Sequence, residues 1–142
     1  NMINKIYSKL NPSLILHIIY TNDVTAEKIN SKKVHSLSEA EHCLQAMVFE
    51  MPAGTKSNPH KHNIQERRTT HTHEALLLLK GSIELFIYDI DNSFVDKKIL
   101  NEGDCSIIIN GGHNIHTLSD VKFFEFKNGP YYGPEKDKTS FE

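Results

Sequence analysis

Residues 74–89, EALLLLKGSIELFIYD, decide the fold class of this chain. Two apolar runs, Glu74 to Leu79 and Ser82 to Asp89, flank Lys80-Gly81. Short apolar runs on either side of a glycine-containing turn are typical of a β-hairpin. We therefore predict a tight hairpin here, and we expect its neighbours along the chain to be strands as well.

Short apolar runs bounded by turn residues continue on both sides of the predicted hairpin, which is the pattern of β-strands. No segment of useful length has the periodicity of a helix. Closely spaced strands without intervening helices indicate a sandwich or barrel, of which the double-sheet jelly roll is one form. The predicted strands are 14–20, 43–51, 94–100, 105–109, 115–118 and 121–127.

The composition argues against several classes of partner. The chain has 142 residues, with 16 Lys+Arg against 18 Asp+Glu and no long run of one sign, so there is no electrostatic reason to expect nucleic acid or an anionic membrane surface. No apolar segment approaches the ~20 residues that a membrane-spanning helix needs, and no secretory signal is evident. Cys43 and Cys105 lack CxxC spacing, which favours free thiols over a disulfide framework. We expect a cytoplasmic protein.

Three histidines and a glutamate have the spacing of metal ligands. His60 and His62 are two residues apart, so they project to the same face if this segment is extended. Glu74 opens the next apolar run, and His113 follows a Gly-Gly turn. Two imidazoles on one face, a carboxylate from a neighbouring strand and a third imidazole from a distant turn would form a cage for one divalent metal ion.

These residues belong to spaced blocks that resemble the two sequence motifs of the cupin superfamily, small β-barrels that hold a metal with three histidines and a glutamate. The closest resemblance is to the small single-domain cupins associated with surface-polysaccharide and sugar-nucleotide pathways, and it covers about residues 44–141. The blocks that carry it are PHKHN, HEALLLLKGSIELFIYD, GD…NGGH and EFKNGPYYGPEKDK, with Gly54 before His60, Gly81 after Glu74 and Gly103 before the Gly-Gly turn.

The resemblance implies a double-stranded β-helix, a jelly-roll barrel of the cupin type with an added N-terminal strand region. We expect residues 1–142 to form one domain. Within it, residues 14–41 would form an N-terminal strand and polar connection, 43–127 the metal-binding barrel, and 128–142 a C-terminal tail. Since an N-terminal strand outside such a core often pairs with a neighbouring subunit, we expect a homodimer by analogy of fold.

Two ligand positions have alternatives. The superfamily pattern expects the glutamate three or four residues after His62, where the chain has Glu66, but the glycine expected seven residues later is found only after Glu74. His113 and His116 have opposite parity, so only one of them can face the interior of a regular strand. We favour Glu74 over Glu66, because of Gly81, and His113 over His116, because the resemblance places the ligand directly after Gly-Gly.

Parity also places His71 and His73 on the face opposite Glu74, where we expect them to lie on the surface or to pack against a loop. Three further residues are candidates for binding a substrate. Arg67 lies in the long polar loop at the expected mouth of the site. Glu125 and Lys127 alternate on a strand within the EFKNGPY block and therefore share a face.

Three imidazoles and one carboxylate leave coordination positions open, as a Lewis acid or an oxygen-activating centre requires. Iron(II), manganese(II), nickel(II) and zinc(II) all accept this donor set. The resemblance therefore implies a metal-dependent isomerase or epimerase acting on a small polar metabolite, a sugar or a sugar-derived acid. An iron-dependent dioxygenase and a non-catalytic metabolite-binding protein are the alternatives, because one fold carries many activities.

Overall fold

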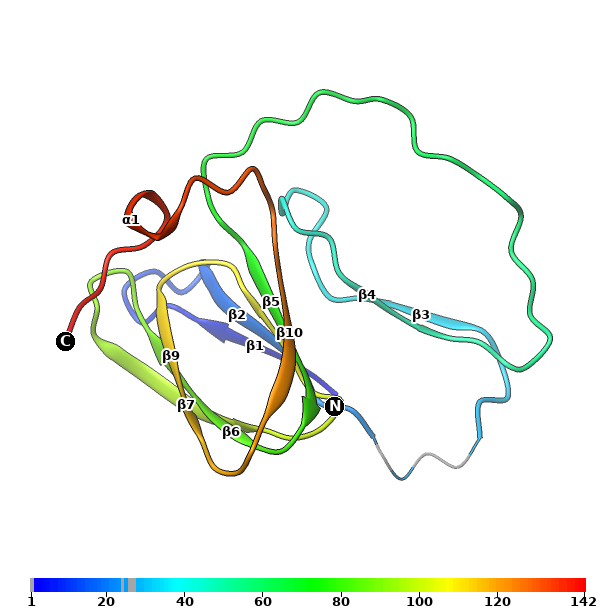
Figure 1. Cartoon of the computed structure of the whole chain (residues 1–142), viewed down its shortest axis with the longest axis horizontal. Helices are drawn as coiled ribbons and strands as arrows, with labels where there is room; N and C mark the ends of the chain where they lie inside the picture. Colours follow the sequence, from blue (N-terminus) through cyan, green and yellow to red (C-terminus); the bar gives the residue numbers. More distant parts are fainter. Residues whose placement is uncertain (1, 24, 26–27) are drawn as a thin grey trace.

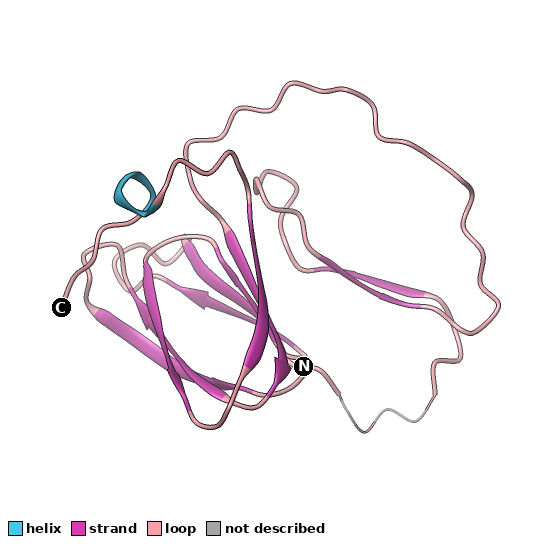
Figure 2. Ribbon diagram, viewed as in Figure 1, coloured by secondary structure: helices cyan, strands magenta, loops and turns pink. Residues whose placement is uncertain are grey.

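The computed structural model describes residues 2–23, 25 and 28–142, and in these residues the fold is all-β, as the sequence predicts (Figures 1 and 2). No helix in these ranges has the length and apolar character needed to cross a membrane. The elements are β1 (Ile3–Tyr7), β2 (Ile15–Tyr20), β3 (Lys33–Ser36), β4 (Met47–Glu50), β5 (Glu74–Lys80), β6 (Ile83–Tyr88), β7 (Phe94–Leu100), β8 (Cys105–Ile108), β9 (Gly112–Thr117), β10 (Lys122–Lys127) and α1 (Pro134–Asp137).

The strands form three antiparallel sheets. A five-stranded sheet has the order β1-β2-β8-β5-β10 and a three-stranded sheet the order β7-β6-β9, and β3 and β4 form a two-stranded ribbon. The two larger sheets pack face to face, because one apolar cluster contains residues of both. Its fully buried members include Leu16 and Leu78 from the first sheet and Ile83, Leu85 and Ile87 from the second.

Strand β2 lies inside this core, so the prediction that the N-terminal strand stays outside it is wrong. All six residues of β2 are buried, because both faces of the strand are covered. Leu16 and Ile19 face the three-stranded sheet, whereas Ile15 and Ile18 pack in a second cluster on the outer face. A run of apolar residues in a strand buried on both faces is expected to be continuous rather than alternating.

The predicted β5–β6 hairpin is also wrong, although both strands exist. β5 pairs with β8 and β10, whereas β6 pairs with β7 and β9. At Gly81, which has a φ of +81°, the chain crosses from one sheet to the other. The apolar side chains of β5 and β6 therefore pack against each other across the core, and the two strands share no backbone hydrogen bonds.

The ribbon β3–β4 stands beside the two packed sheets (Figure 1). Val48 on one of its faces packs with Leu44 and Ala46 against the outer face of the five-stranded sheet. From Pro52 to His73 the chain has no regular secondary structure, and it passes in a wide arc away from the core before it returns to β5 (Figure 1). The strand predicted over 43–51 is confined to Met47–Glu50.

The Leu85→Ala variant is expected to lower the free energy of unfolding by about 2–5 kcal/mol, since it leaves a cavity where a fully buried side chain packs against both sheets. Denaturant unfolding followed by fluorescence or circular dichroism measures this change. The matched control is Ile99→Ala on the neighbouring strand, where the side chain is 56% exposed and the expected change is within about 0.5 kcal/mol. Equal losses in the two variants would contradict the packing described here.

Candidate functional site

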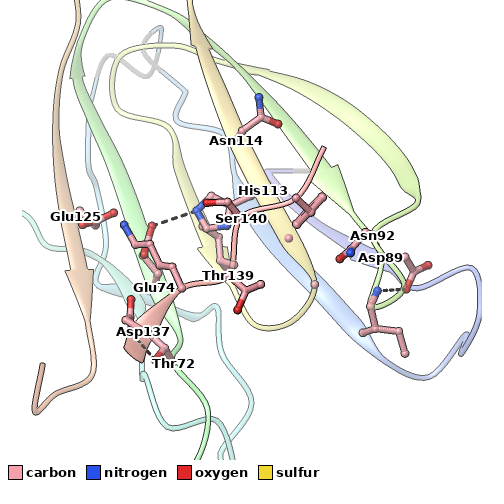
Figure 3. Close-up of a pocket in the computed structure, with 16 residues that line it drawn as sticks. Thr72, Glu74, Asp89, Asn92, His113, Asn114, Glu125, Asp137, Thr139 and Ser140 are labelled. Carbon is pink, nitrogen blue, oxygen red and sulfur yellow. Dashed lines mark hydrogen bonds and ion pairs between the residues drawn. The ribbon is translucent and has the colours of Figure 1, made fainter. Parts of the chain in front are cut away.

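Polar side chains gather at one end of the two packed sheets, where the apolar core gives way to a cavity of about 670 Å³ (Figure 3). Strand register explains why they meet. His17 and Glu74 each pair with Ile108, from opposite sides of β8, and Lys127 pairs with Glu74. Directly paired residues share a face of the sheet, so these side chains all lie on the face that looks toward the second sheet.

His113 reaches the same place from the three-stranded sheet. It pairs with the buried Ile87 and so points inward, and its Nε2 lies 3.4 Å from Oε1 of Glu74 (Figure 3). The turn before it depends on Gly111, which has a φ of +74° and packs so closely on the carbonyl oxygen of Tyr88 that a Cβ would collide with it. The turn thus fixes His113 opposite Glu74.

A lysine and two further carboxylates surround this pair. Nζ of Lys127 lies 3.9 Å from Glu74, 3.7 Å from Glu125 and 3.8 Å from Asp137. Asp137 belongs to the short C-terminal helix α1 and accepts a hydrogen bond from Oγ1 of Thr72 at 3.2 Å. One cation therefore lies among three acids in a partly desolvated site, an arrangement typical of functional groups.

The two glutamates shift each other's pKa in opposite directions. Burial by itself raises the pKa of Glu74, but hydrogen bonds from His113 and Glu125, with the charges of His113 and Lys127, outweigh it and lower the pKa. The hydrogen bond to Glu74 raises the pKa of Glu125, and burial and the charge of Glu74 raise it further. The two carboxyl groups therefore interact directly, and Glu125 is the one that takes up a proton more readily.

Sequence reasoning missed His17, which has no partner at a recognisable spacing. Its Nδ1 lies 3.1 Å from Oγ of Ser106, and its ring centroid lies 6.2 Å from that of His113. Its Nε2 is buried and has no hydrogen-bond partner among the residues that the structure describes. Burial, with the nearby charge of His113, lowers the pKa of His17 to about 3. The single histidine within the apolar run ILHIIY was the only signal in the sequence.

His60 and His62 lie elsewhere. Both are exposed in the arc between β4 and β5, with their ring centroids 5.7 Å apart. Nδ1 of His60 donates to the backbone oxygen of Asn58 at 3.0 Å. Within residues 2–23, 25 and 28–142, no three His, Cys, Asp or Glu side chains are placed to hold a metal ion together. The structure therefore brings Glu74 and His113 together but leaves the other two predicted ligands outside.

The alternative ligands do not lie in the cavity. Glu66 is in the exposed arc, where Oε1 accepts from Nε of Arg68 at 2.8 Å. His116 pairs with Glu84 on the outer face of β9, and its ring centroid is 4.5 Å from that of Phe86. Arg67 is also exposed in the arc. Of the predicted substrate-binding residues, only Glu125 and Lys127 are beside Glu74.

His73 is buried against the segment before β4, so of the two positions expected for it, surface or packed against a loop, it takes the second. It does point away from Glu74, as parity requires, but its 7% exposure shows that the outer face of the sheet is covered there. The ring of His42 lies 5.6 Å away, centroid to centroid. The segment before β4 covers His73. The alternation of residues along β5 cannot predict which other part of the chain packs on its outer face.

Comparison with known proteins identifies one family. Residues 26–100 match a family described as a domain of unknown function (DUF6016). The matched region contains His60, His62 and Glu74 and ends before His113. No curated protein and no solved structure matches the chain.

Proposed function

The chain belongs to the DUF6016 family, and on the geometry of its site we propose that it is a metal-binding cupin that isomerises or epimerises a small polar metabolite, a sugar or sugar-derived acid. The observation that carries the proposal is the meeting of Glu74 and His113, 3.4 Å apart on facing sheets, beside Glu125 and Lys127 in a cavity of about 670 Å³. A cavity of this size accommodates one small ligand.

The path of the chain supports a jelly roll. From β5 onward the chain alternates between the two large sheets: β5 lies in the first, β6 and β7 in the second, β8 in the first, β9 in the second and β10 in the first. An antiparallel chain that winds between two facing sheets in this way is the pattern of a double-stranded β-helix. The cupin assignment requires this winding.

The donor chemistry of Glu74 and His113 fits a divalent transition metal, because carboxylate oxygen and imidazole nitrogen are ligands that iron, manganese, nickel and zinc all accept. His60 and His62 would complete the set at a cavity that they enter. A metal held there would polarise a carbonyl or hydroxyl oxygen of the substrate as a Lewis acid.

The protein's own groups account for proton transfer. Glu125 lies beside Glu74, and its interaction with Glu74 raises its pKa, which suits a group that takes up and gives back a proton. With Glu74 assigned to the metal, Glu125 can remove a proton from the carbon next to a carbonyl and return it to that carbon or to its neighbour, with no net oxidation. The ammonium group of Lys127 lies near both glutamates and would stabilise the negative charge on the substrate oxygen in between.

The lining of the cavity suits a polyhydroxylated substrate. Besides the acids, its lining includes Asn92, Thr139 and Ser140 (Figure 3). Amides and hydroxyls both donate and accept hydrogen bonds, as recognition of sugar hydroxyls requires.

A screen of neutral and acidic sugars tests the function. Protein loaded with Ni²⁺ is expected to gain thermal stability with a sugar that binds its native state. For that sugar, NMR in D₂O is expected to show deuterium entering the carbon beside the carbonyl. The Glu125→Gln variant should lose at least about a hundredfold in exchange rate, since general acid–base groups contribute 10²–10⁴-fold. Glu135→Gln, an exposed glutamate of α1, is the matched control.

The other outcomes identify the alternatives. Oxygen consumption with Fe²⁺ and a sugar-derived acid, without deuterium exchange, would identify a dioxygenase. Tight binding of a sugar with neither exchange nor oxygen uptake would identify a binding protein. Either result would overturn the isomerase proposal.

A further inference from the structure

The ribbon β3–β4 has an uncovered apolar face. Val34 and Phe49 pair across the ribbon and share this face with Met47 and Met51, and these side chains are 38–55% exposed. The opposite face carries Val48, which already packs on the protein's own sheet. Contiguous exposed apolar side chains of this kind mark a surface that another chain covers.

A second uncovered apolar surface lies on β10. Phe124 and Phe126 are each 51% exposed, and their rings stack with centroids 5.6 Å apart. They point away from the cavity, because Glu125 between them points into it. β10 is also the outermost strand of the five-stranded sheet, and the preceding strand β9 is the outermost strand of the other. Within the described chain, each has one edge without a paired strand, which is a template for strand addition.

The charges of the arc and the cavity are complementary. Residues 52–72 carry two lysines and two arginines but only one acid, Glu66. The cavity is lined by four acids, Glu74, Asp89, Glu125 and Asp137, and by one lysine, Lys138, and Lys127 lies against three of the acids; the acids still outnumber the lysines. A basic segment is therefore attracted to the acidic mouth of the cavity.

We propose that two copies of this chain form a dimer in which residues 55–62 of each chain are exchanged into the other, while each ribbon β3–β4 stays packed on its own sheet through Val48. The apolar face of β3–β4 would pack on Phe124 and Phe126 of the partner, and residues 55–62 would add as a strand along the free edge of the partner's β9. His60 and His62 are two residues apart and share one face of a strand, so both would project into the partner's cavity. There they would join Glu74 and His113 to complete the metal site. The role of the exchange in binding a metal rests on the proposed metal centre. The exchange itself does not.

A dimer accounts for more of the exposed apolar surface than a single chain whose arc closes onto its own cavity. Residues 51–60 span up to about 30 Å when extended, so the arc is long enough to reach a cavity outside its own chain. Closure within one chain would bring the histidines to the cavity but leave the apolar face of β3–β4 uncovered, because the ribbon's other face is already occupied. Two copies related by a twofold axis cover both the ribbon and the β10 surface in each chain.

Mixing two complementary variants tests the exchange. His60→Ala/His62→Ala and Glu74→Gln/His113→Ala are each expected to lose Ni²⁺ binding. In an exchanged heterodimer, the cavity of the first variant receives intact histidines from the second, so one of the two sites is restored. Random pairing after co-refolding makes half of the dimers mixed, so the mixture is expected to regain roughly a quarter of the wild-type nickel content. Mixed dimers without any regained nickel would overturn the exchange.

Oligomeric state and hydrogen exchange test it without metal. Wild-type protein is expected to be a dimer by light scattering, with amide protection over residues 55–62. Phe124→Asp/Phe126→Asp is expected to be a monomer that loses this protection. Ile99→Asp, on a side chain that is 56% exposed on β7, is the matched control and should stay a dimer. A wild-type monomer, or a dimer with residues 55–62 unprotected, would overturn the exchange. Wild-type dimers with protected 55–62 but no nickel would instead overturn the metal centre alone.

Discussion

The Glu74→Gln variant is expected to bind Ni²⁺ at least about a hundredfold more weakly than the wild-type protein, because loss of even the outer partners of metal ligands costs 10–100-fold. The substitution keeps the shape of the side chain and removes only its charge. Nε2 of His113, 3.4 Å from Glu74, would lose its anionic partner. Competition with a chelating dye at pH 7 measures the affinity.

Glu84→Gln is the matched control for this experiment. Glu84 lies on the outer face of β6 with Oε1 3.4 Å from Nζ of Lys97, so its charge does not reach the cavity and the affinity is expected to stay unchanged. Equal affinity of Glu74→Gln and wild type would contradict the assignment of Glu74. Glu66→Gln in the same assay would then decide whether the arc supplies the carboxylate.

The His17→Leu variant is expected to remove much of the acid sensitivity of the fold. The pKa of His17 is lowered from 6.5 to about 3, so the unfolded chain binds more protons between these values. Stability that depends on the neutral imidazole is therefore fully present above pH 6.5 and is lost as the pH falls toward 3. Between pH 7 and pH 4 this loss amounts to about 3 kcal/mol.

Urea unfolding at pH 7 and pH 4 measures the difference. Wild type should lose about 3 kcal/mol more than His17→Leu between the two conditions. His71→Leu, on an exposed histidine of the arc, should follow the wild-type curve. An unchanged pH dependence in His17→Leu would mean that other groups, such as the Glu74 carboxylate, dominate acid unfolding.

Local pattern predicted most of the strands, though not β1 or β3, and it did not predict which strands pair. The apolar runs at 82–89 and 94–100 were identified from the sequence, and they contain β6 and β7. The partner of β5 was not identified, because a turn at Gly81 is compatible with a hairpin or with a crossing between sheets. Pairing depends on contacts between residues far apart in the chain, which periodicity does not encode.

The same limit applies to the site. Glu74 and His113 were singled out by their spacing to glycines, and the structure brings them together. His17 joins them only because β2 and β5 flank β8, a relation that no linear spacing reveals. The positions of His60 and His62 could not be predicted for another reason. The segment that carries them makes few contacts with its own chain, so its position depends on the surface that it binds.

The central position of β2 also constrains the order in which the protein folds. Its histidine contacts Ser106, 89 residues further along the chain, and β8 separates β2 from β5. During synthesis, the very apolar strand β2 therefore has one unpaired edge until β8 has left the ribosome. Contacts of such long range slow folding, since a large loop must close before they form. Nascent chains that stop short of β8 are thus expected to be the species most exposed to aggregation and most dependent on chaperones.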